Sequence, residues 1–462
     1  MTDLDPSPDR LWRKIFRRII PVVTIAWLCS YIDRGSLGYV AVPLSKDLGL
    51  SATSFGFAAG IVFIGYVVVP VPGNLIAYRV GARTWITGIL VAWSLVTAAT
   101  AAVDSAATLY LARILLGFAE GGIGSAILLY LSFWIPRSQQ SKALSYLFLV
   151  NPVSAITGAL MASFLLSHDR LVLGLAGWRS VFLTEGILSL LVAVLVWLLL
   201  VDKPRDASWL TGPEREMLQA ELDRDATQAR GAAVTSARAP FRDRRVWALA
   251  FANFAITFGV SPLVFFLPKM ITVIQHSLHN SQAVLITIIP QVIAAVVMTA
   301  WARLARRRTP VAATIIPATA AAVAIAVAAY ASSGVTFVSA VCVALAGSYS
   351  AIPQFWRLPP LLLSGSAAAA GLALIVAGAN FSALVGPYVT GHIEDLTGNF
   401  RDTLLLITAI MLLGVVTIAL VGRSALRSQA AGAEAGIAVN RRRSRTRTTS
   451  ASGSSTSGAA QR

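Results

Sequence analysis

Charged residues are scarce in this chain. Of its 462 residues, 13% are Asp, Glu, Lys or Arg, whereas ordinary soluble domains carry roughly 25%. Cysteine is scarcer still: Cys29 and Cys342 are the only two, and both lie in apolar runs, which excludes a disulfide scaffold and a cysteine-based zinc module. The sequence also lacks a nucleophile–His–acid set, a phosphate-binding loop and a cluster of metal ligands. We therefore expect neither a soluble enzyme nor a bound cofactor or metal.

Hydrophobic residues, in contrast, make up 56% of the chain and are gathered in long runs. A helix of about 20 apolar residues is long enough to cross a bilayer. The runs predict twelve spans, approximately at residues 19–43, 55–78, 84–103, 108–134, 142–166, 180–201, 246–274, 281–302, 310–330, 335–363, 367–391 and 403–422. The predicted fold is an all-α polytopic membrane protein with twelve transmembrane helices in two six-helix halves around a central cavity.

The net charge of +17 indicates membrane topology rather than nucleic acid binding. If the N-terminus is cytoplasmic, thirty of the 38 Lys and Arg fall in cytoplasmic segments and four in external ones, as the positive-inside rule requires. We expect both termini in the cytoplasm, a location in the inner (cytoplasmic) membrane, and contacts between basic side chains and anionic lipid headgroups. Nucleic acid is not an expected partner, and the first span should remain as an uncleaved signal anchor.

A charged connector separates the two groups of six spans. Within it Thr211 precedes Glu214 by three residues, the spacing of a capping box, so we expect a surface helix there. The tail is rich in Ala, Ser, Gly and Thr and has few apolar residues to bury, which predicts disorder. The predicted organisation is a cytoplasmic N-terminus (1–18), an N-terminal half (19–201), a cytoplasmic linker (202–245), a C-terminal half (246–423) and a disordered basic cytoplasmic tail (424–462).

Several charged side chains fall inside the predicted spans: the acids Asp33, Glu120 and Glu185, and the cations Arg34, Arg113, Arg179 and Arg357. Each costs on the order of 2.5–3.5 kcal/mol at the bilayer centre, so each needs a partner or a function. A buried carboxyl group can exchange a proton near neutral pH, and a guanidinium can bind a substrate carboxylate in two places. Because Asp33 and Glu120 lie near the middle of their spans, we interpret them as a proton relay beside an anion site.

The alternative is that pairs of arginine and carboxylate only hold helices together. We prefer this structural interpretation for Arg179 and Glu185, because Trp178-Arg179 begins the sixth span, where a Trp and an Arg are ordinary interfacial anchors. Gly117 and Gly121 have the GxxxG spacing. This spacing predicts close packing against another transmembrane helix rather than dinucleotide binding, for which a preceding strand is lacking.

Motifs spread over residues 20–423 point to a known family. They include Tyr31-Ile32-Asp33-Arg34, Phe63-Ile64-Gly65-Tyr66, Arg79-Val80-Gly81-Ala82-Arg83, Arg113 to Glu120, Gly177-Trp178-Arg179, Asp202-Lys203-Pro204-Arg205, Phe355-Trp356 and Val385-Gly386-Pro387-Tyr388. In these motifs and their order the chain resembles the major facilitator superfamily. Within it, the chain is similar to the anion:cation symporter branch, which includes tartrate, phthalate, hydroxyphenylacetate and sugar-acid permeases.

The resemblance implies proton-driven uptake of an organic carboxylate by alternating access. It implies that Asp33 and Glu120 carry protons, while Arg34 and two tyrosines line the central site and a tryptophan packs on the substrate. The candidate substrate-binding residues are Tyr31, Arg34, Tyr66, Arg113, Asn151, Trp356, Arg357 and Asn380. The proton gradient takes the place of a cofactor, and we expect a monomer.

The chain departs from the family pattern at three positions of this candidate site. Ser36 stands where the first-span motif usually has Asn, Val376 stands where the eleventh span usually has Asn, and Arg357 replaces a small residue. These changes favour a sparsely hydroxylated or aromatic carboxylate, including one with two acid groups, unless Arg357 lies nearer the cytoplasmic mouth. Proton-coupled efflux of drugs or metabolites and a receptor that binds such an acid without moving it remain as alternatives.

Overall fold

The computed structural model describes residues 8–148, 150–230, 243–362 and 367–422. Within these ranges all regular structure is helical. Eleven helices are long and apolar enough to cross a membrane, and a bent pair of helices raises the number to twelve if it forms one span. The fold predicted from the apolar runs is confirmed in this respect. The predicted tail lies outside the described residues.

The N-terminal half contains α1 to α11. Their bounds are α1 Pro8–Tyr39, α2 Ala41–Asp47, α3 Ala52–Ile61, α4 Phe63–Val68, α5 Pro70–Val80, α6 Ala82–Thr100, α7 Ala106–Glu120, α8 Ile123–Ser132, α9 Arg137–Phe148, α10 Val150–Ser167 and α11 Gly177–Leu199. A 3-10 turn, η1 (Pro204–Asp206), and α12 (Gly212–Arg230) follow in the linker.

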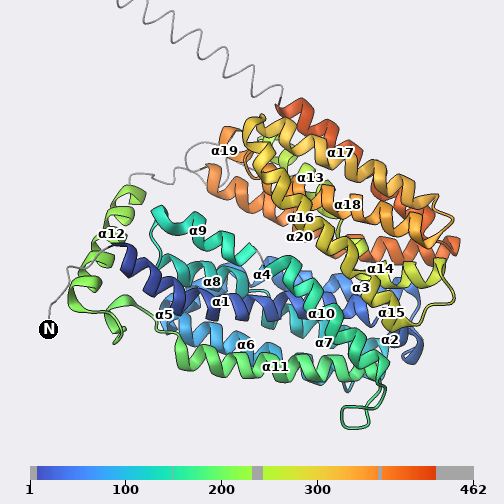
Figure 1. The fold of residues 1–462 in the computed structure, drawn as a ribbon, viewed down its shortest axis with the longest axis horizontal. Helices are drawn as coiled ribbons and strands as arrows, with labels where there is room; N and C mark the ends of the chain where they lie inside the picture. Colours follow the sequence, from blue (N-terminus) through green and yellow to red (C-terminus); the bar gives the residue numbers. More distant parts are fainter. Residues whose placement is uncertain (1–7, 149, 231–242, 363–366, 423–462) are drawn as a thin grey trace, which may run out of the picture.

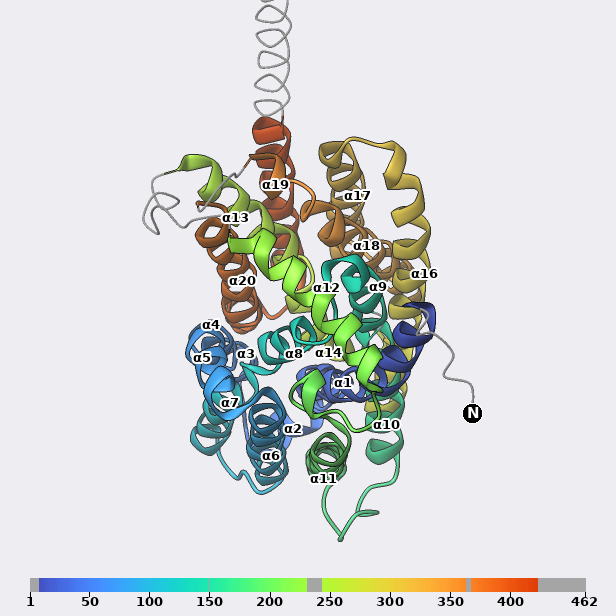
Figure 2. The same ribbon diagram turned by 90° about the vertical axis from the view of Figure 1, so that its left-hand side faces the viewer.

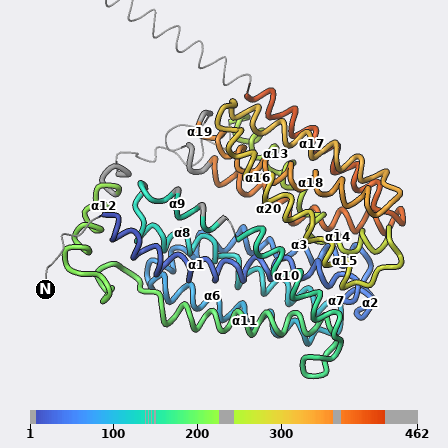
Figure 3. Tube along the Cα trace, in the orientation of Figure 1, coloured from blue at the N-terminus to red at the C-terminus, as the bar shows by residue number. Residues whose placement is uncertain are grey.

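The C-terminal half contains the remaining helices. Their bounds are α13 Arg244–Phe258, α14 Ser261–Ile274, α15 Asn280–Ile286, α16 Ile288–Leu304, η3 Ala305–Arg307, α17 Pro310–Ala329, α18 Gly334–Phe355, α19 Pro359–Leu362 and α20 Ala367–Thr397, and a last helix covers Arg401–Gly422. In the tube trace the blue-to-green chain forms one bundle and the yellow-to-red chain a second one beside it (Figure 3).

Several predicted spans are less regular than expected: the fourth is divided into α7 and α8, the seventh into α13 and α14, and the eighth into α15 and α16. The second, predicted over 55–78, is divided into α3, α4 and α5, and α2 meets the α3–α4 segment at 116°. Pro70 begins α5, and a proline has no backbone N–H to continue the hydrogen bonding of the preceding helix. The tenth, predicted over 335–363, ends as a continuous helix at Phe355, and α19 begins at Pro359. Apolar runs therefore mark these spans but not their breaks.

The two halves meet at one end of the molecule. We call the end that carries α12 and the start of α1 the linker end, and the end that carries α2 and α15 the far end (Figures 1 and 2). At the far end, α3 of one half lies directly against α20 of the other, where a Cβ on Gly391 would lie 1.9 Å from the carbonyl oxygen of Ala52. The ribbons of the two halves diverge toward the linker end (Figure 1).

A carboxylate of the C-terminal half caps a helix of the N-terminal half at this contact. Oδ1 of Asp395 accepts a hydrogen bond from the backbone N–H of Ala52 at 2.9 Å, and Oδ2 accepts one from Thr53 at 2.7 Å. The first N–H groups of a helix have no partner within the helix. Asp395 therefore both satisfies the start of α3 and connects the two halves.

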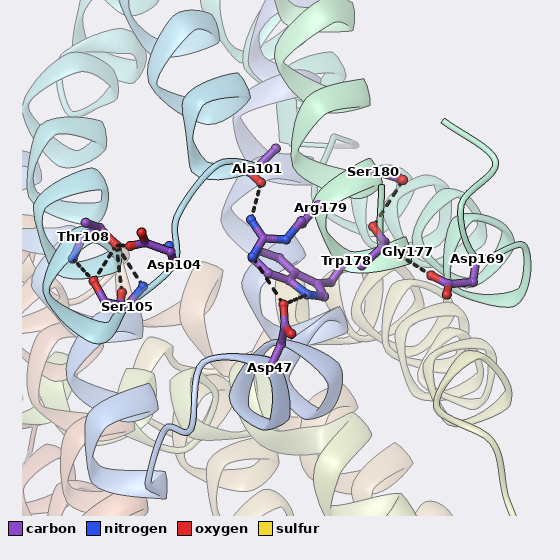
Figure 4. A network of polar contacts seen from close by, with 11 residues as sticks. Asp47, Ala101, Asp104, Ser105, Thr108, Asp169, Gly177, Trp178, Arg179 and Ser180 are labelled. Carbon is purple, nitrogen blue, oxygen red and sulfur yellow. Dashed lines mark hydrogen bonds and ion pairs between the residues drawn. The ribbon is translucent and has the colours of Figure 1, made fainter. Parts of the chain in front are cut away.

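Within the N-terminal half, Asp47 of α2 holds the start of α11 at the far end. Its Oδ2 accepts from the indole N–H of Trp178 at 3.0 Å and lies 3.3 Å from Nη2 of Arg179, while Nη1 of Arg179 donates to the carbonyl of Ala101 at 2.8 Å (Figure 4). These contacts join α2, α6 and α11. They match the structural role predicted for Arg179.

At the linker end, α12 begins with the predicted capping box. The N–H of Thr211 donates to Oε2 of Glu214 at 2.9 Å, and the N–H of Glu214 donates to Oγ1 of Thr211 at 3.4 Å. Leu218 of this helix is fully buried. The linker helix is thus docked on the N-terminal half rather than free in solvent.

Candidate transport site

Arg34, on α1, lies between two aromatic rings. Its guanidinium carbon is 4.7 Å from the ring centre of Tyr31 and 4.6 Å from that of Tyr66, which belongs to α4. A guanidinium on the faces of two tyrosines is held by cation–π attraction and keeps its N–H edge available. The Nε of Arg34 and the hydroxyl of Tyr66 are buried atoms that make no hydrogen bond to a described residue. They are donors suited to an anion.

Glu120, the last residue of α7, faces the same guanidinium. Its Oε1 lies 4.0 Å from Nη2 of Arg34 and accepts a hydrogen bond from the hydroxyl of Ser30. Glu120 is only 1% exposed. The distance is at the outer limit of an ion pair, so Glu120 and Arg34 attract each other without being locked together.

A close helix crossing brings Tyr66 to this position. A Cβ on Gly65 would lie 2.0 Å from the carbonyl oxygen of Gly117, and a Cβ on Gly121 would lie 2.6 Å from the carbonyl oxygen of Gly65. Only glycine permits α4 and α7 to approach so closely. The predicted packing role of the Gly117–Gly121 spacing is therefore confirmed. The residue after Gly65 is Tyr66, which this crossing places beside the end of α7.

Asp33 is adjacent to Arg34 in sequence but points into the N-terminal half. It is 1% exposed, and its Oδ1 accepts from the hydroxyl of Thr97 on α6 at 2.9 Å. Its Oδ2 is buried without a hydrogen-bond partner among the described residues. The charges of Glu120 and Arg113 act on Asp33. The two predicted proton carriers are thus electrostatic neighbours in the protein interior.

Arg113 lies behind this cluster rather than at its surface. It is 1% exposed, and its Nε donates to the backbone carbonyl of Ala58 at 3.3 Å. Its charge acts on Asp33 and Glu120. In this structure Arg113 is a counter-charge for the buried carboxyl groups, whereas the sequence had suggested a direct substrate ligand.

The predicted residues of the C-terminal half are more dispersed. Trp356 caps the end of α18, lies edge-on to Phe355 and is 36% exposed. Nη1 of Arg357 donates to the carbonyl of Ala305 in η3 at 3.1 Å and to Oε1 of Gln354 at 2.9 Å. Arg357 therefore belongs to the linker end, the alternative position noted for it, and not to the Arg34 cluster. The expectation of a second carboxylate anchor there has no support in this conformation.

The two predicted amides lie on helices α10 and α20. Asn151 and Asn380 are both half-buried, and the backbone carbonyl of Asn151 accepts from the hydroxyl of Ser154 at 2.8 Å. Tyr349 of α18, which the sequence did not single out, is a neighbour of Tyr31. Its approach to the cluster depends on how the two halves dock, so no local pattern could have identified it.

Ser30 and Thr97 contact the two predicted proton carriers, but the sequence did not identify them as site residues. A serine or threonine in an apolar span is common and carries little signal by itself. The spacing of Ser30 three residues before Asp33 places both on one helix face, and this was the pattern that could have identified Ser30.

Comparison with known proteins identifies the family. The sequence model described as Major Facilitator Superfamily matches residues 23–371, which is most of the chain. The chain belongs to the Major Facilitator Superfamily. It is 36% identical over 417 residues to a protein of Agrobacterium vitis named "Putative tartrate transporter", covering 90% of this chain and 92% of that protein. The inner membrane transport protein RhmT of Escherichia coli is 28% identical over 416 residues, covering 89% and 95%.

Solved structures agree on the fold. A bacterial homologue of the human lysosomal transporter Spinster, in an inward-facing and unoccupied conformation, superposes with a TM-score of 0.75 at 17% identity, covering 89% of this chain and 98% of that one. The protein is thus a multi-pass membrane transporter of the superfamily, as the motifs predicted, and not an enzyme. Its similarity to a protein named for tartrate is consistent with the organic-anion branch.

Proposed function

We propose that this transporter is a proton-coupled symporter that imports an organic carboxylate by alternating access. One observation carries the proposal: the Arg34 guanidinium lies between two tyrosines, with unpartnered donors on Arg34 and Tyr66 and a buried carboxyl group, Glu120, 4.0 Å away. Such a site attracts a carboxylate through a fixed cation and places a proton-binding group beside it.

Coupling follows from competition for one guanidinium. An ionised Glu120 attracts Arg34 and opposes the entry of a second anion. A protonated Glu120 has no charge and leaves Arg34 free to bind the substrate carboxylate. Release of the substrate again favours ionisation of Glu120, because the cation beside it is no longer neutralised. Asp33 is the second proton carrier, placed in the interior behind Glu120.

The charge distribution supports an orientation in the inner membrane with both termini in the cytoplasm. The linker end, with Arg10, Arg13, Arg17 and Arg18 at the start of α1, then faces the cytoplasm. The contacts between α3 and α20 close the far, external end. This arrangement corresponds to an inward-facing state. We further propose that the transporter works as a monomer and prefers sparsely hydroxylated or aromatic acids.

Transport into vesicles tests the proposal. The purified protein, reconstituted with its linker end inside, should accumulate labelled benzoate or L-tartrate when an inward proton gradient is imposed. Asp33→Asn and Glu120→Gln should each abolish accumulation, because an amide cannot cycle a proton. Glu216→Gln, which removes an exposed carboxylate of α12, is the matched control and should accumulate the acid as the wild type does.

The outcomes separate the alternatives. If Asp33→Asn and Glu120→Gln both still accumulate the acid, the proton relay is disproved. Expulsion of the acid under the same gradient would indicate efflux instead of uptake. A receptor would bind the acid but would show no counterflow of labelled substrate in the absence of a gradient.

A further inference from the structure

Three polar side chains lie on one face of α1 in the interior of the N-terminal half. Ser30, Asp33 and Ser36 are spaced three residues apart, which places them on one side of a helix, and each is 1% exposed or less. From the first to the third the helix rises about 9 Å. We call these three residues the α1 polar stripe.

Each member of the stripe contacts a polar side chain from a different helix. Ser30 donates to Glu120 of α7, and Asp33 accepts from Thr97 of α6. Ser36, the member nearest the far end, makes a hydrogen-bond contact with Oε1 of Glu185 on α11. The stripe thus continues from the Arg34 cluster to a third buried carboxyl group.

Among the described residues, Glu185 forms no ion pair with a cation. It is 3% exposed, and its Oε2 is buried without a hydrogen-bond partner among them. Asp33 and Arg113 are the charged groups that act on it, and Cys29 and Tyr39 of α1 are its titratable neighbours. An unpaired buried carboxylate costs several kcal/mol, so the neutral form is favoured here.

The hydrogen bonds of Ser36 point to the same form. Its hydroxyl lies 2.9 Å from the carbonyl oxygen of Ile32 and also contacts Oε1 of Glu185, but a hydroxyl has only one hydrogen to donate. If Glu185 is ionised, Ser36 donates to it and the bond to Ile32 is lost. If Glu185 is protonated, it donates to Ser36 and Ser36 donates to Ile32, so both contacts are satisfied.

We propose that Glu185 is a third proton-binding carboxyl group of this transporter, connected to Asp33 by the α1 polar stripe. The proposal rests on the proton-coupled symport argued above. A proton that leaves Glu185 is bound by Asp33, whose Oδ2 is unpartnered, and Ser36 turns its hydroxyl from Ile32 to the ionised Glu185. This proposed role in proton transfer differs from the structural role that the sequence favours for Glu185.

The number of protons moved with each substrate molecule tests this proposal. In Glu185→Gln, the amide N–H₂ can donate to Ser36 as a protonated carboxyl does, so the packing is preserved. We expect this variant still to concentrate the acid but to move about one proton fewer per substrate molecule, measured as the ratio of proton influx to labelled benzoate or L-tartrate influx in the same vesicles. Glu394→Gln is the matched control, because Glu394 also has a buried unpartnered Oε2 but is paired with Lys269 at 2.7 Å. Its ratio should equal that of the wild type.

An unchanged ratio in Glu185→Gln would overturn the proposal, whereas a wild type that moves the acid without protons would overturn the proposed symport itself. If Glu185→Gln does not fold, the proposal is tested by comparing the infrared spectra of the wild type and Ser36→Ala. The carbonyl band of a protonated carboxyl group should shift when Ser36 is removed as its hydrogen-bond acceptor, and a band that does not move would contradict the assignment.

Discussion

The ammonium group of Lys14 lies 2.7 Å from Oε2 of Glu214, and this ion pair joins the start of α1 to the first turn of the linker helix α12. The same carboxylate completes the capping box of α12. Beside it, the rings of Trp134 and Trp209 stack with centres 5.5 Å apart, and the guanidinium of Arg18 lies 5.4 Å from the centre of the Trp209 ring. The linker is thereby fastened to the N-terminal half before the chain enters the C-terminal half.

This attachment should depend on pH. Burial raises the pKa of Glu214, but the hydrogen bonds from Lys14 and Thr211 outweigh burial and hold the pKa below its ordinary value. A carboxyl group with a lowered pKa stabilises the folded state at neutral pH, and this stability is lost as the pH falls through the pKa of the folded state. Glu214→Gln should therefore cost about 1 kcal/mol at neutral pH and almost nothing in acid. Thermal unfolding of the two proteins over a pH series measures this, and a difference that is constant with pH would contradict it.

Arg34→Lys should not behave as a conservative change. A lysine keeps the charge but loses the planar edge that binds a carboxylate in two places, and it stacks less well between Tyr31 and Tyr66. We expect the apparent KM for the acid to rise about tenfold or more. Initial uptake rates over a range of substrate concentrations provide the measurement. Wild-type KM in the lysine variant would remove Arg34 from the list of substrate ligands.

The crossing of α4 and α7 should tolerate no side chain at Gly65. In Gly65→Ala the new Cβ would meet the backbone of Gly117 at 2.0 Å, so the helices must separate and move Tyr66 away from Arg34. We expect a loss of roughly 1–3 kcal/mol in stability together with weaker substrate binding. Gly88→Ala is the control, because no atom lies within 4 Å of a Cβ at that position on α6. It should be neutral or stabilising by up to about 1 kcal/mol. Equal effects in the two variants would argue against the crossing.

The choice of substrate should depend on Val376. This residue of α20 is 45% exposed and offers no hydrogen bond, so a substrate hydroxyl buried against it would lose roughly 1–3 kcal/mol. Benzoate should therefore compete for uptake better than L-tartrate in the wild type, and Val376→Asn should shift the preference toward L-tartrate. Competition assays with both acids decide this. A wild type that already prefers L-tartrate would disprove the role of Val376 without affecting the symport.

Features that depend on neighbours within one helix could be predicted from the sequence. The capping box of Thr211 and Glu214 and the packing face of Gly117 and Gly121 are fixed by spacing along a helix, and both are present as predicted. The family resemblance, not spacing, places Tyr31 and Arg34 in one site, and these residues of α1 lie together in the structure.

Features that depend on the partner helix could not be predicted in this way. Periodicity shows that Ser36 and Glu185 are buried but not that α11 presents Glu185 to α1. It places Arg357 inside the tenth span, and it shows neither that α18 ends at Phe355 nor that the carbonyl oxygen of Ala305 lies 3.1 Å from Nη1 of Arg357. The sequence shows Pro70 as a residue that can end a helix. Whether the span is divided there depends on how the neighbouring helices pack, which the sequence does not show.

The cap that Asp395 places on α3 has a consequence for the transport cycle. In the proposed alternating-access cycle the far end must open, and Asp395 would then leave the N–H groups of Ala52 and Thr53. Each cycle therefore removes and restores a helix cap, and loss of such a cap typically costs about 1 kcal/mol. Water must solvate the exposed start of α3 in the outward-facing state. The free-energy difference between the two states is thus set in part by a hydrogen-bond exchange at the surface, far from the substrate, where dissolved salts and neighbouring lipid headgroups can influence it.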